Sequence, residues 1–219
     1  GHSNWLDALD KACREWGCFQ VCNHSLDEAL CTNILSEMEQ FFALPPEDKQ
    51  ALERSADNPW GFYDRELTKN VRDWKQIFDV GPTATQGPFG GALTPWPQQL
   101  ATFRSTVEAY YAASQSLALS LLGDIGECLG VQRGLLEADF GEDHSSFLRL
   151  NYYPTCTEPE RHLGISPHTD AGALTVLMTD GQTGLQFQRG GDWYTVQPVP
   201  DALTINIGDI VQVWSNDRY

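Results

Sequence analysis

The chain has 219 residues, of which 41% are apolar, and its 30 acidic and 14 basic side chains give a net charge of −16. This length suits one large domain or two small ones. No apolar run is long enough to form a transmembrane helix, so we expect no membrane partner. A strongly acidic surface repels phosphate backbones, so we also expect no nucleic-acid partner.

The six cysteines stand at positions 13, 18, 22, 31, 128 and 156, and no two of them form a CxxC pair. A structural zinc site would need such pairs, and a disulfide framework would need an oxidising compartment. Reduced and mostly buried thiols explain the same residues without either feature. We therefore predict a cytoplasmic protein with free cysteines.

Helical patterns dominate the first part of the chain. In the segment 26–43, apolar residues recur at i, i+4 and i+7, which predicts an amphipathic helix that two prolines then end. A second long stripe of apolar residues predicts a helix over 98–129, with Gly130 as its natural C-cap. The other elements expected here are a helix over 5–16, a short strand over 17–22, a short helix from 47, and a loop-rich segment over 55–97 with one or two strands such as Trp74–Val80.

The pattern changes after Ser146 to short β-rich runs that are separated by turn residues. The expected strands cover 146–153, 173–179, 184–188, 193–197, 202–207 and 210–214. Even spacing of this kind is typical of an antiparallel sandwich or a jelly roll. The chain is therefore predicted to be an α+β protein in which helices come first and a β core follows.

One short stretch of this β region carries chemistry. The sequence "ISPHTDAGALTVL" over 165–177 places His168 and Asp170 one residue apart, just before a run of β-formers. If this stretch is a strand, the two side chains share one face, because side chains alternate along a strand. An imidazole and a carboxylate together suit Fe(II), Mn or Zn. The motif alone fits equally well a histidine that is hydrogen-bonded to a carboxylate.

The surrounding motifs add a resemblance to a known family. "FLRLNYYP" (147–154), "SPHTDAGALTVL" (166–177), "GLQF" (184–187) and "VPDALTINIGDIVQVWSNDRY" (199–219) follow one another in order. This succession resembles the isopenicillin-N-synthase-like, plant-type branch of the Fe(II)/2-oxoglutarate-dependent dioxygenases. "ACREWGCFQVCNHSLD" (12–27) and "ELTKNVRDWKQIFDVG" (66–81) resemble the opening and middle segments of the same family.

The resemblance implies a fold and a division of the chain. A double-stranded β-helix (jelly roll) core over 131–219 would follow a helical N-terminal region with a few strands over 1–130. The family's second metal-binding histidine would fall about five residues past Tyr219, and its Arg-x-Ser clamp for 2-oxoglutarate would come later still. The jelly roll is therefore expected to be truncated at its C-terminus, and we expect the chain to be part of a longer protein.

The resemblance also implies the roles of individual residues. His168 and Asp170 would be catalytic residues that bind Fe(II) as two members of a facial triad of two histidines and one carboxylate, which leaves coordination positions open for 2-oxoglutarate and O2. Asn151 and Tyr153 would hold the 2-oxoglutarate cosubstrate through an amide N–H and a phenolic O–H. The two side chains would share a strand face.

Three further residues are candidates for binding the substrate. Arg149 would contact an acidic or phenolic group of the substrate, or it would pair with a carboxylate of the protein. Phe147 would belong to the pocket wall or to the core, and Trp74 would line the mouth of the substrate site or serve only packing. The sequence does not decide between these alternatives.

The expected activity is an oxidoreductase, a dioxygenase that hydroxylates or desaturates a small organic molecule with Fe(II), O2 and 2-oxoglutarate, and releases succinate and CO2. The resemblance also suggests that ascorbate would help the reaction. Two alternatives remain open. One is an oxidase of the same fold that does not use 2-oxoglutarate, and the other is an inactive relative that only binds a small molecule.

Overall fold

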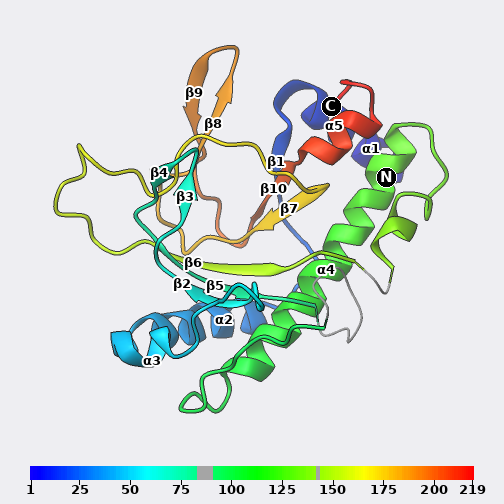
Figure 1. Ribbon diagram of the computed structural model, residues 1–219. Coiled ribbons are helices and arrows are strands. Elements are labelled where there is room, and N and C mark those ends of the chain that lie inside the picture. Colours follow the sequence, from blue (N-terminus) through cyan, green and yellow to red (C-terminus); the bar gives the residue numbers. More distant parts are fainter. Residues whose placement is uncertain (83–90, 142–143) are drawn as a thin grey trace. The chain divides into compact units, whose positions relative to one another are not determined.

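The computed structural model describes residues 1–82, 91–141 and 144–219 (Figure 1). The chain divides into two compact units, and each is assembled from segments that are distant in the sequence. The first unit consists of residues 1–28, 113–138 and 169–219, and the second unit consists of residues 29–112 and 139–168. The predicted boundary between a region 1–130 and a region 131–219 stays a prediction.

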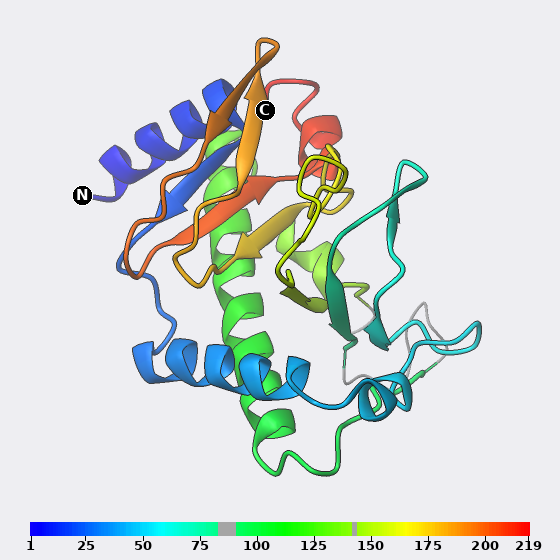
Figure 2. The same ribbon diagram turned by 90° about the vertical axis from the view of Figure 1, so that its left-hand side faces the viewer.

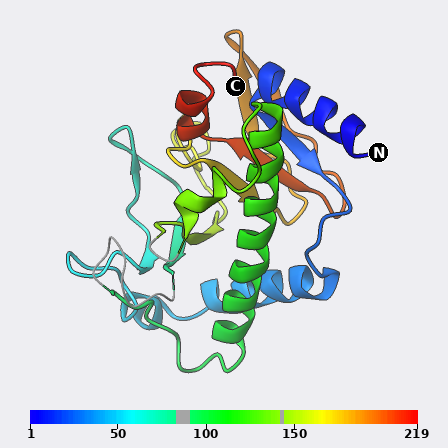
Figure 3. The same cartoon turned by 90° about the vertical axis from the view of Figure 1, so that its right-hand side faces the viewer.

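The helices of the first part of the chain are confirmed. They are α1 (His2–Trp16), α2 (Glu28–Phe42), α3 (Pro46–Gln50) and α4 (Phe103–Cys128). Helix α1 ends at Gly17, which adopts the left-handed conformation with φ 65° that favours glycine at a helix C-terminus. Helix α4 is continuous over its 26 residues, as Figure 3 shows.

The first unit is built on an antiparallel three-stranded sheet with the order β1-β10-β7 (Figure 2). Its strands are β1 (Cys18–Val21), β7 (Leu174–Leu177) and β10 (Leu203–Ile207). The central residue Ile205 pairs with Phe19 on one side and Val176 on the other, and it is fully buried. The strands β8 (Gln186–Arg189) and β9 (Asp192–Thr195) form a separate hairpin that turns at two glycines with positive φ.

The second unit contains an antiparallel sheet with the order β2-β5-β6 and a small hairpin. The sheet strands are β2 (Gly61–Tyr63), β5 (Gln76–Val80) and β6 (Leu148–Tyr152), and the hairpin consists of β3 (Leu67–Thr68) and β4 (Val71–Arg72). Lys69 and Asn70 connect the hairpin strands, and both have positive φ, of 51° and 64°. This is the pattern of a type I′ turn, whose twist matches that of the strands.

Aromatic side chains fill the core of the second unit. The ring of Phe41 on α2 is fully buried and contacts four other phenylalanines. Its ring centroid lies 5.1 Å from that of Phe42, 6.5 Å from Phe62, 4.7 Å from Phe78 and 5.0 Å from Phe103. The cluster therefore joins α2, α4 and the sheet strands β2 and β5 into one core.

Two expectations about secondary structure are wrong. The segment 210–214 was expected to be a strand, but it belongs to helix α5 (Asp209–Trp214). Its β-branched residues favour a strand locally, whereas the acidic Asp209 in the first turn and the buried Val211 favour the helix. The described part of 55–97 holds four short strands, whereas one or two were expected. Strands of two or three residues are too short to show an alternating pattern in the sequence, so they could not be predicted. Residues 83–90 of that segment lie outside the described residues.

All six cysteines are free thiols, and they differ in accessibility. Cys22 is exposed, whereas Cys13 is only 1% exposed and burial raises the pKa of its thiol to about 12. Because the thiolate is the reactive form, we expect iodoacetamide to label Cys22 in the folded protein and to label Cys13 only after unfolding. Peptide mass spectrometry of samples labelled with and without urea measures this, and labelling of native Cys13 at the rate of Cys22 would contradict it.

No helix among the described residues combines the length and the apolarity needed to cross a membrane.

Candidate functional site

His168 lies in an irregular segment that precedes β7, so the argument that it shares a strand face with Asp170 does not apply. Its Nδ1 is 3.0 Å from the backbone oxygen of Ser166. A carbonyl oxygen can only accept a hydrogen bond, so Nδ1 is the donor in this contact. In a neutral ring with that donor, Nε2 would be the nitrogen able to bind a metal.

The segment that carries His168 is held by a buried acid. The Ser166 N–H donates to Oδ1 of Asp73 at 3.3 Å. The other oxygen of Asp73 accepts from the Thr68 hydroxyl at 2.7 Å and lies 3.1 Å from the Lys75 Nζ. Asp73 and Lys75 are 2% and 4% exposed. The roles of Asp73 and Lys75 were not predicted from the sequence. The visible signal there is the pair of opposite charges on either side of Trp74, just before strand β5.

Asp170 lies in the same irregular segment, but it belongs to the first unit. The side-chain amide of Asn206 on β10 donates to its Oδ2 at 3.1 Å, and its backbone oxygen accepts from the Asp209 N–H at 2.8 Å. The Oδ1 of Asn206 is buried, and none of the residues that the structure describes forms a hydrogen bond with it. Asn206 was missed by the sequence analysis, although an amide in the middle of the apolar run "LTINI" is a signal of a polar role.

The boundary between the two units falls between His168 and Thr169, so the contacts of each candidate ligand are those of its own unit. Each side chain, taken within its own unit, offers a donor that first-row metals such as Fe(II) use. One is an imidazole with a backbone oxygen beside its Nδ1, and the other is a carboxylate that accepts a hydrogen bond from an amide.

The two candidate cosubstrate residues lie on and next to β6. Asn151 is in the strand, where it pairs with Ile77 of β5. Tyr153 follows the last residue of the strand, so the argument that both side chains share a strand face does not extend to it. The ring of Tyr153 packs so closely on Gly164 that a Cβ at that glycine would lie 2.9 Å from it. Tyr153 as a whole is 51% exposed, so Gly164 gives its ring close contact on one side only.

Arg149 on β6 pairs with carboxylates of its own unit. Its Nε and Nη2 donate to the two oxygens of Asp79, both at 2.7 Å, and its Nη1 donates to Glu66 at 3.1 Å. Burial alone would lower the pKa of Arg149, but the hydrogen bonds and charges of these two acids raise it. Of the two roles left open by the sequence, the structure shows the pairing with protein carboxylates, and the substrate contact stays a prediction.

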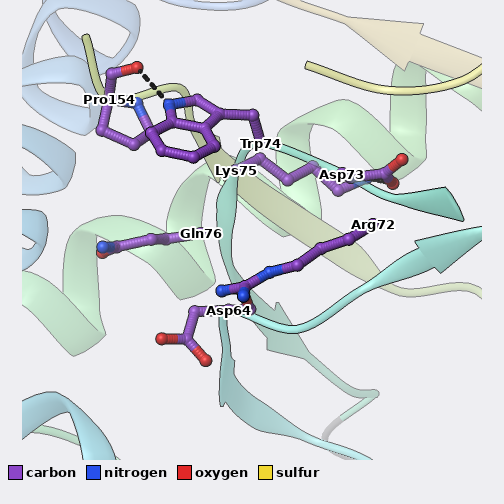
Figure 4. A pocket seen from close by; sticks show the side chains of 7 residues that line it. All are labelled: Asp64, Arg72, Asp73, Trp74, Lys75, Gln76 and Pro154. Atoms are coloured by element: carbon purple, nitrogen blue, oxygen red, sulfur yellow. Dashed lines mark hydrogen bonds and ion pairs between the residues drawn. The ribbon is translucent and has the colours of Figure 1, made fainter. Parts of the chain in front are cut away.

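Phe147 and Trp74 have different surroundings. Phe147 is 49% exposed, so the alternative that it is a core residue is wrong, although its ring centroid lies 6.2 Å from that of the buried Trp60. Trp74 donates from its indole N–H to the backbone oxygen of Pro154 at 3.0 Å, and its ring centroid lies 4.7 Å from that of His162. Figure 4 shows this bond at one side of a pocket.

The pocket beside Trp74 belongs entirely to the second unit. It has a volume of about 180 Å³, which is below the roughly 300–1,000 Å³ of most small-molecule sites. Its walls combine an aromatic ring with charged side chains (Figure 4). The lining residues are Asp64, Arg72, Asp73, Trp74, Lys75, Gln76 and Pro154.

Among the described residues, one group of three has ligand atoms close enough to share a metal ion, namely His2, Asp124 and Glu127. Each of its carboxylate oxygens already accepts a hydrogen bond. Arg133 donates to both acids, the indole of Trp5 donates to Asp124 at 2.8 Å, and His2 lies 3.3 Å from Glu127. An ion-pair network therefore accounts for this cluster.

Helices with antiparallel sheets are also the fold of solved jelly-roll oxygenases of the 2OG-Fe(II) type. The crystal structure of JOX2 in complex with 2OG, Fe and JA superposes on it with a TM-score of 0.88 and 32% identity, over 99% of this chain and 64% of that one. Residues 144–219 match the family model of the 2OG-Fe(II) oxygenase superfamily, and residues 1–99 match that of the non-haem dioxygenase in morphine synthesis N-terminal region. The chain belongs to the 2OG-Fe(II) oxygenase superfamily. The predicted family and the α+β jelly-roll class are thereby confirmed.

Curated plant proteins show the same relationship. The oxoglutarate-dependent flavonoid 7-O-demethylase 1 of Ocimum basilicum is 39% identical over 98% of this chain and 57% of its own length. The thebaine 6-O-demethylase of Papaver somniferum is 34% identical over 98% of this chain and 59% of its own length. The chain thus spans less than two thirds of the length of these relatives.

Proposed function

We propose that the protein is an Fe(II)- and 2-oxoglutarate-dependent oxygenase that hydroxylates or desaturates a small organic molecule. The observation that carries the proposal is the 3.0 Å contact between His168 Nδ1 and the Ser166 oxygen, which in a neutral ring would leave Nε2 as the ligand atom. The family of the chain and the 2OG and Fe bound by JOX2 support the same chemistry.

In this proposal His168 and Asp170 are metal ligands, and each is oriented by a neighbour of its own unit. The bond from Asn206 leaves the Asp170 carboxylate in one orientation, and the bond to Ser166 fixes the plane of the imidazole. When bound, Fe(II) with 2-oxoglutarate would activate O2 and couple the loss of CO2 from the cosubstrate to oxidation of the substrate. The protein residues would supply position and exclude water.

The cosubstrate and the substrate are assigned to residues of the second unit. Asn151 and Tyr153 would donate hydrogen bonds to 2-oxoglutarate, and the 51% exposure of Tyr153 leaves it accessible for such a contact. Trp74, Arg149 and Phe147 would contact the substrate. Because Arg149 already pairs with Asp79 and Glu66, we propose that it serves a phenolic or other neutral polar group rather than a carboxylate.

The proposals about the cellular location and the absence of a nucleic-acid partner rest on composition. Six free thiols support a reducing compartment, and we propose the cytoplasm on that ground. The net charge of −16 is the reason to expect no nucleic-acid partner. We propose ascorbate as an added reductant in assays.

The proposal is tested by replacing each candidate ligand in the full-length protein. Both His168→Ala and Asp170→Ala are expected to abolish specific binding of Mn(II), a redox-inert substitute for Fe(II), and to stop succinate formation in the presence of a panel of flavonoids and alkaloids. His162→Ala is the control for Mn(II) binding, which it should leave unchanged; it does not serve as a control for succinate formation, because its ring contacts the candidate substrate residue Trp74. Titration with detection of free Mn(II), together with assay of succinate, measures the effect.

Three outcomes would contradict the proposal in different ways. Unchanged Mn(II) binding in both variants would remove the metal site. Oxygen uptake with substrate but without succinate would favour the oxidase that does not use 2-oxoglutarate. A substrate that binds and is never oxidised would favour the inactive relative.

A further inference from the structure

We propose that Asp73 is a positioning residue for the metal ligand His168, acting through the backbone of Ser166. The inference rests on the proposed function, since it gives the buried acid a role in metal binding. All of the contacts involved lie within the second unit. Neither the family resemblance nor any motif in the sequence points to it.

The contacts form a continuous path from the acid to the ligand. Asp73 Oδ1 accepts the Ser166 N–H at 3.3 Å, and the Ser166 oxygen accepts the His168 Nδ1–H at 3.0 Å. Ser166 is only 6% exposed, so water does not compete for either group. The Asp73 carboxylate therefore holds the N–H of Ser166, and the backbone oxygen of the same residue orients the His168 imidazole.

The carboxylate is itself held in place on its second oxygen. Thr68 donates to Oδ2 from the β3–β4 hairpin at 2.7 Å, and Lys75 Nζ lies 3.1 Å from the same atom. Lys75 is also 3.9 Å from Glu66, so its buried charge is balanced. With both oxygens engaged, Asp73 has one orientation, and the position of its Oδ1 is determined before any metal arrives.

Stability alone does not explain such an arrangement. A buried ion pair generally contributes little more than apolar residues of the same volume would, because its desolvation cancels most of the attraction. What the pair does provide is a hydrogen-bond acceptor at a fixed point opposite the Ser166 N–H. Outer partners of this kind fix the ring orientation of a metal-binding histidine, and their loss typically weakens metal binding by about 10–100-fold.

Another buried acid of the same unit supplies the matched control. Asp79 is 3% exposed, compared with 2% for Asp73, and it also accepts bonds on both oxygens. Its partners are Arg149 and, at 3.8 Å, Arg54, and none of the contacts given for Asp79 joins it directly to Ser166. Asp79→Asn and Asp73→Asn therefore make the same chemical change at equally buried sites. In each case the aspartate accepts hydrogen bonds on two oxygens, whereas the asparagine has one oxygen and therefore loses at least one of these bonds.

The experiment compares these variants in the full-length protein by Mn(II) titration, thermal unfolding without metal, and hydrogen exchange of the Ser166 amide without metal. Asp73→Asn is expected to weaken Mn(II) binding by about 10-fold and to speed exchange at Ser166. Asp79→Asn is expected to change neither, even where it lowers the melting temperature. The double variant Asp73→Leu/Lys75→Met removes the pair without leaving a buried charge, and it should reproduce the loss of Mn(II) affinity.

The outcomes separate this inference from the proposed function. If the wild-type protein bound Mn(II) and Asp73→Asn bound it equally well, or if affinity fell in both single variants in step with the melting temperature, the positioning role would be overturned while the metal site remained. If the wild-type protein bound no Mn(II), the metal site and the role of Asp73 would both be refuted.

Discussion

Replacement of Phe41 by alanine is expected to lower the free energy of unfolding by about 3–5 kcal/mol, the usual range for a fully buried phenylalanine. The ring is fully buried and lies within 6.5 Å of four other phenylalanine rings, centroid to centroid. Neighbouring rings that are anchored on four different elements cannot all move to fill the space. A cavity therefore remains, and its cost adds to the lost transfer free energy of the ring.

Urea titration followed by tryptophan fluorescence and circular dichroism measures this effect. Leu67→Ala is the control, because Leu67 belongs to the same unit and is 62% exposed. We expect its midpoint to stay near that of the wild type. A Phe41→Ala protein that lost no more stability than the control would show that the aromatic cluster is not the main core of the second unit.

Gly208→Ala is expected to cost about 3 kcal/mol of stability, at the upper end of the usual range for overpacking. A Cβ at this position would lie 2.0 Å from the backbone oxygen of Gly172 and 2.8 Å from that of Asp170. Both obstacles are backbone atoms, so no side chain can rotate away to relieve the contact. The segment that carries Asp170 must move, and Mn(II) binding should weaken together with stability.

Gly172→Ala is the matched control for this change. It lies in the same segment, but a Cβ there would meet no atom within 4 Å. The variant should therefore keep its stability and its Mn(II) affinity. Thermal unfolding and Mn(II) titration of the two variants make the comparison, and a Gly208→Ala protein that behaves like Gly172→Ala would rule out the close approach of these two segments.

Local sequence patterns predicted the regular elements well. The stripe over 26–43 gave a helix that differs from α2 (Glu28–Phe42) by a residue or two, and the run 202–207 contains β10 (Leu203–Ile207). Such patterns predict helices and strands because the apolar residues on the buried face of an element recur with its structural period. The prediction of a strand over 210–214 was wrong because the local residue preference in this segment did not decide the structure. Its β-branched residues favour a strand, and the N-terminal Asp209 with the packing of Val211 decides for a helix.

The candidate site was only partly readable, because its contacts join distant residues. His168 and Asp170 could be singled out from their spacing and from a family resemblance. Their partners Ser166 and Asn206 could not, since a backbone oxygen and an amide 36 residues away leave no motif. The pairing of Arg149 with Asp79 depends on the register of β5 and β6, which no periodicity specifies.

The β3–β4 hairpin separates two kinds of residue that stand close together in the sequence. Its outer positions Leu67 and Val71 are 62% and 54% exposed, and the turn at Lys69 and Asn70 makes no buried contact that the structure gives. Thr68, in contrast, holds the carboxylate of Asp73. Substitutions at the exposed positions of the hairpin would therefore leave the Thr68–Asp73 bond in place, whereas a substitution of Thr68 that lacks a hydroxyl would remove it.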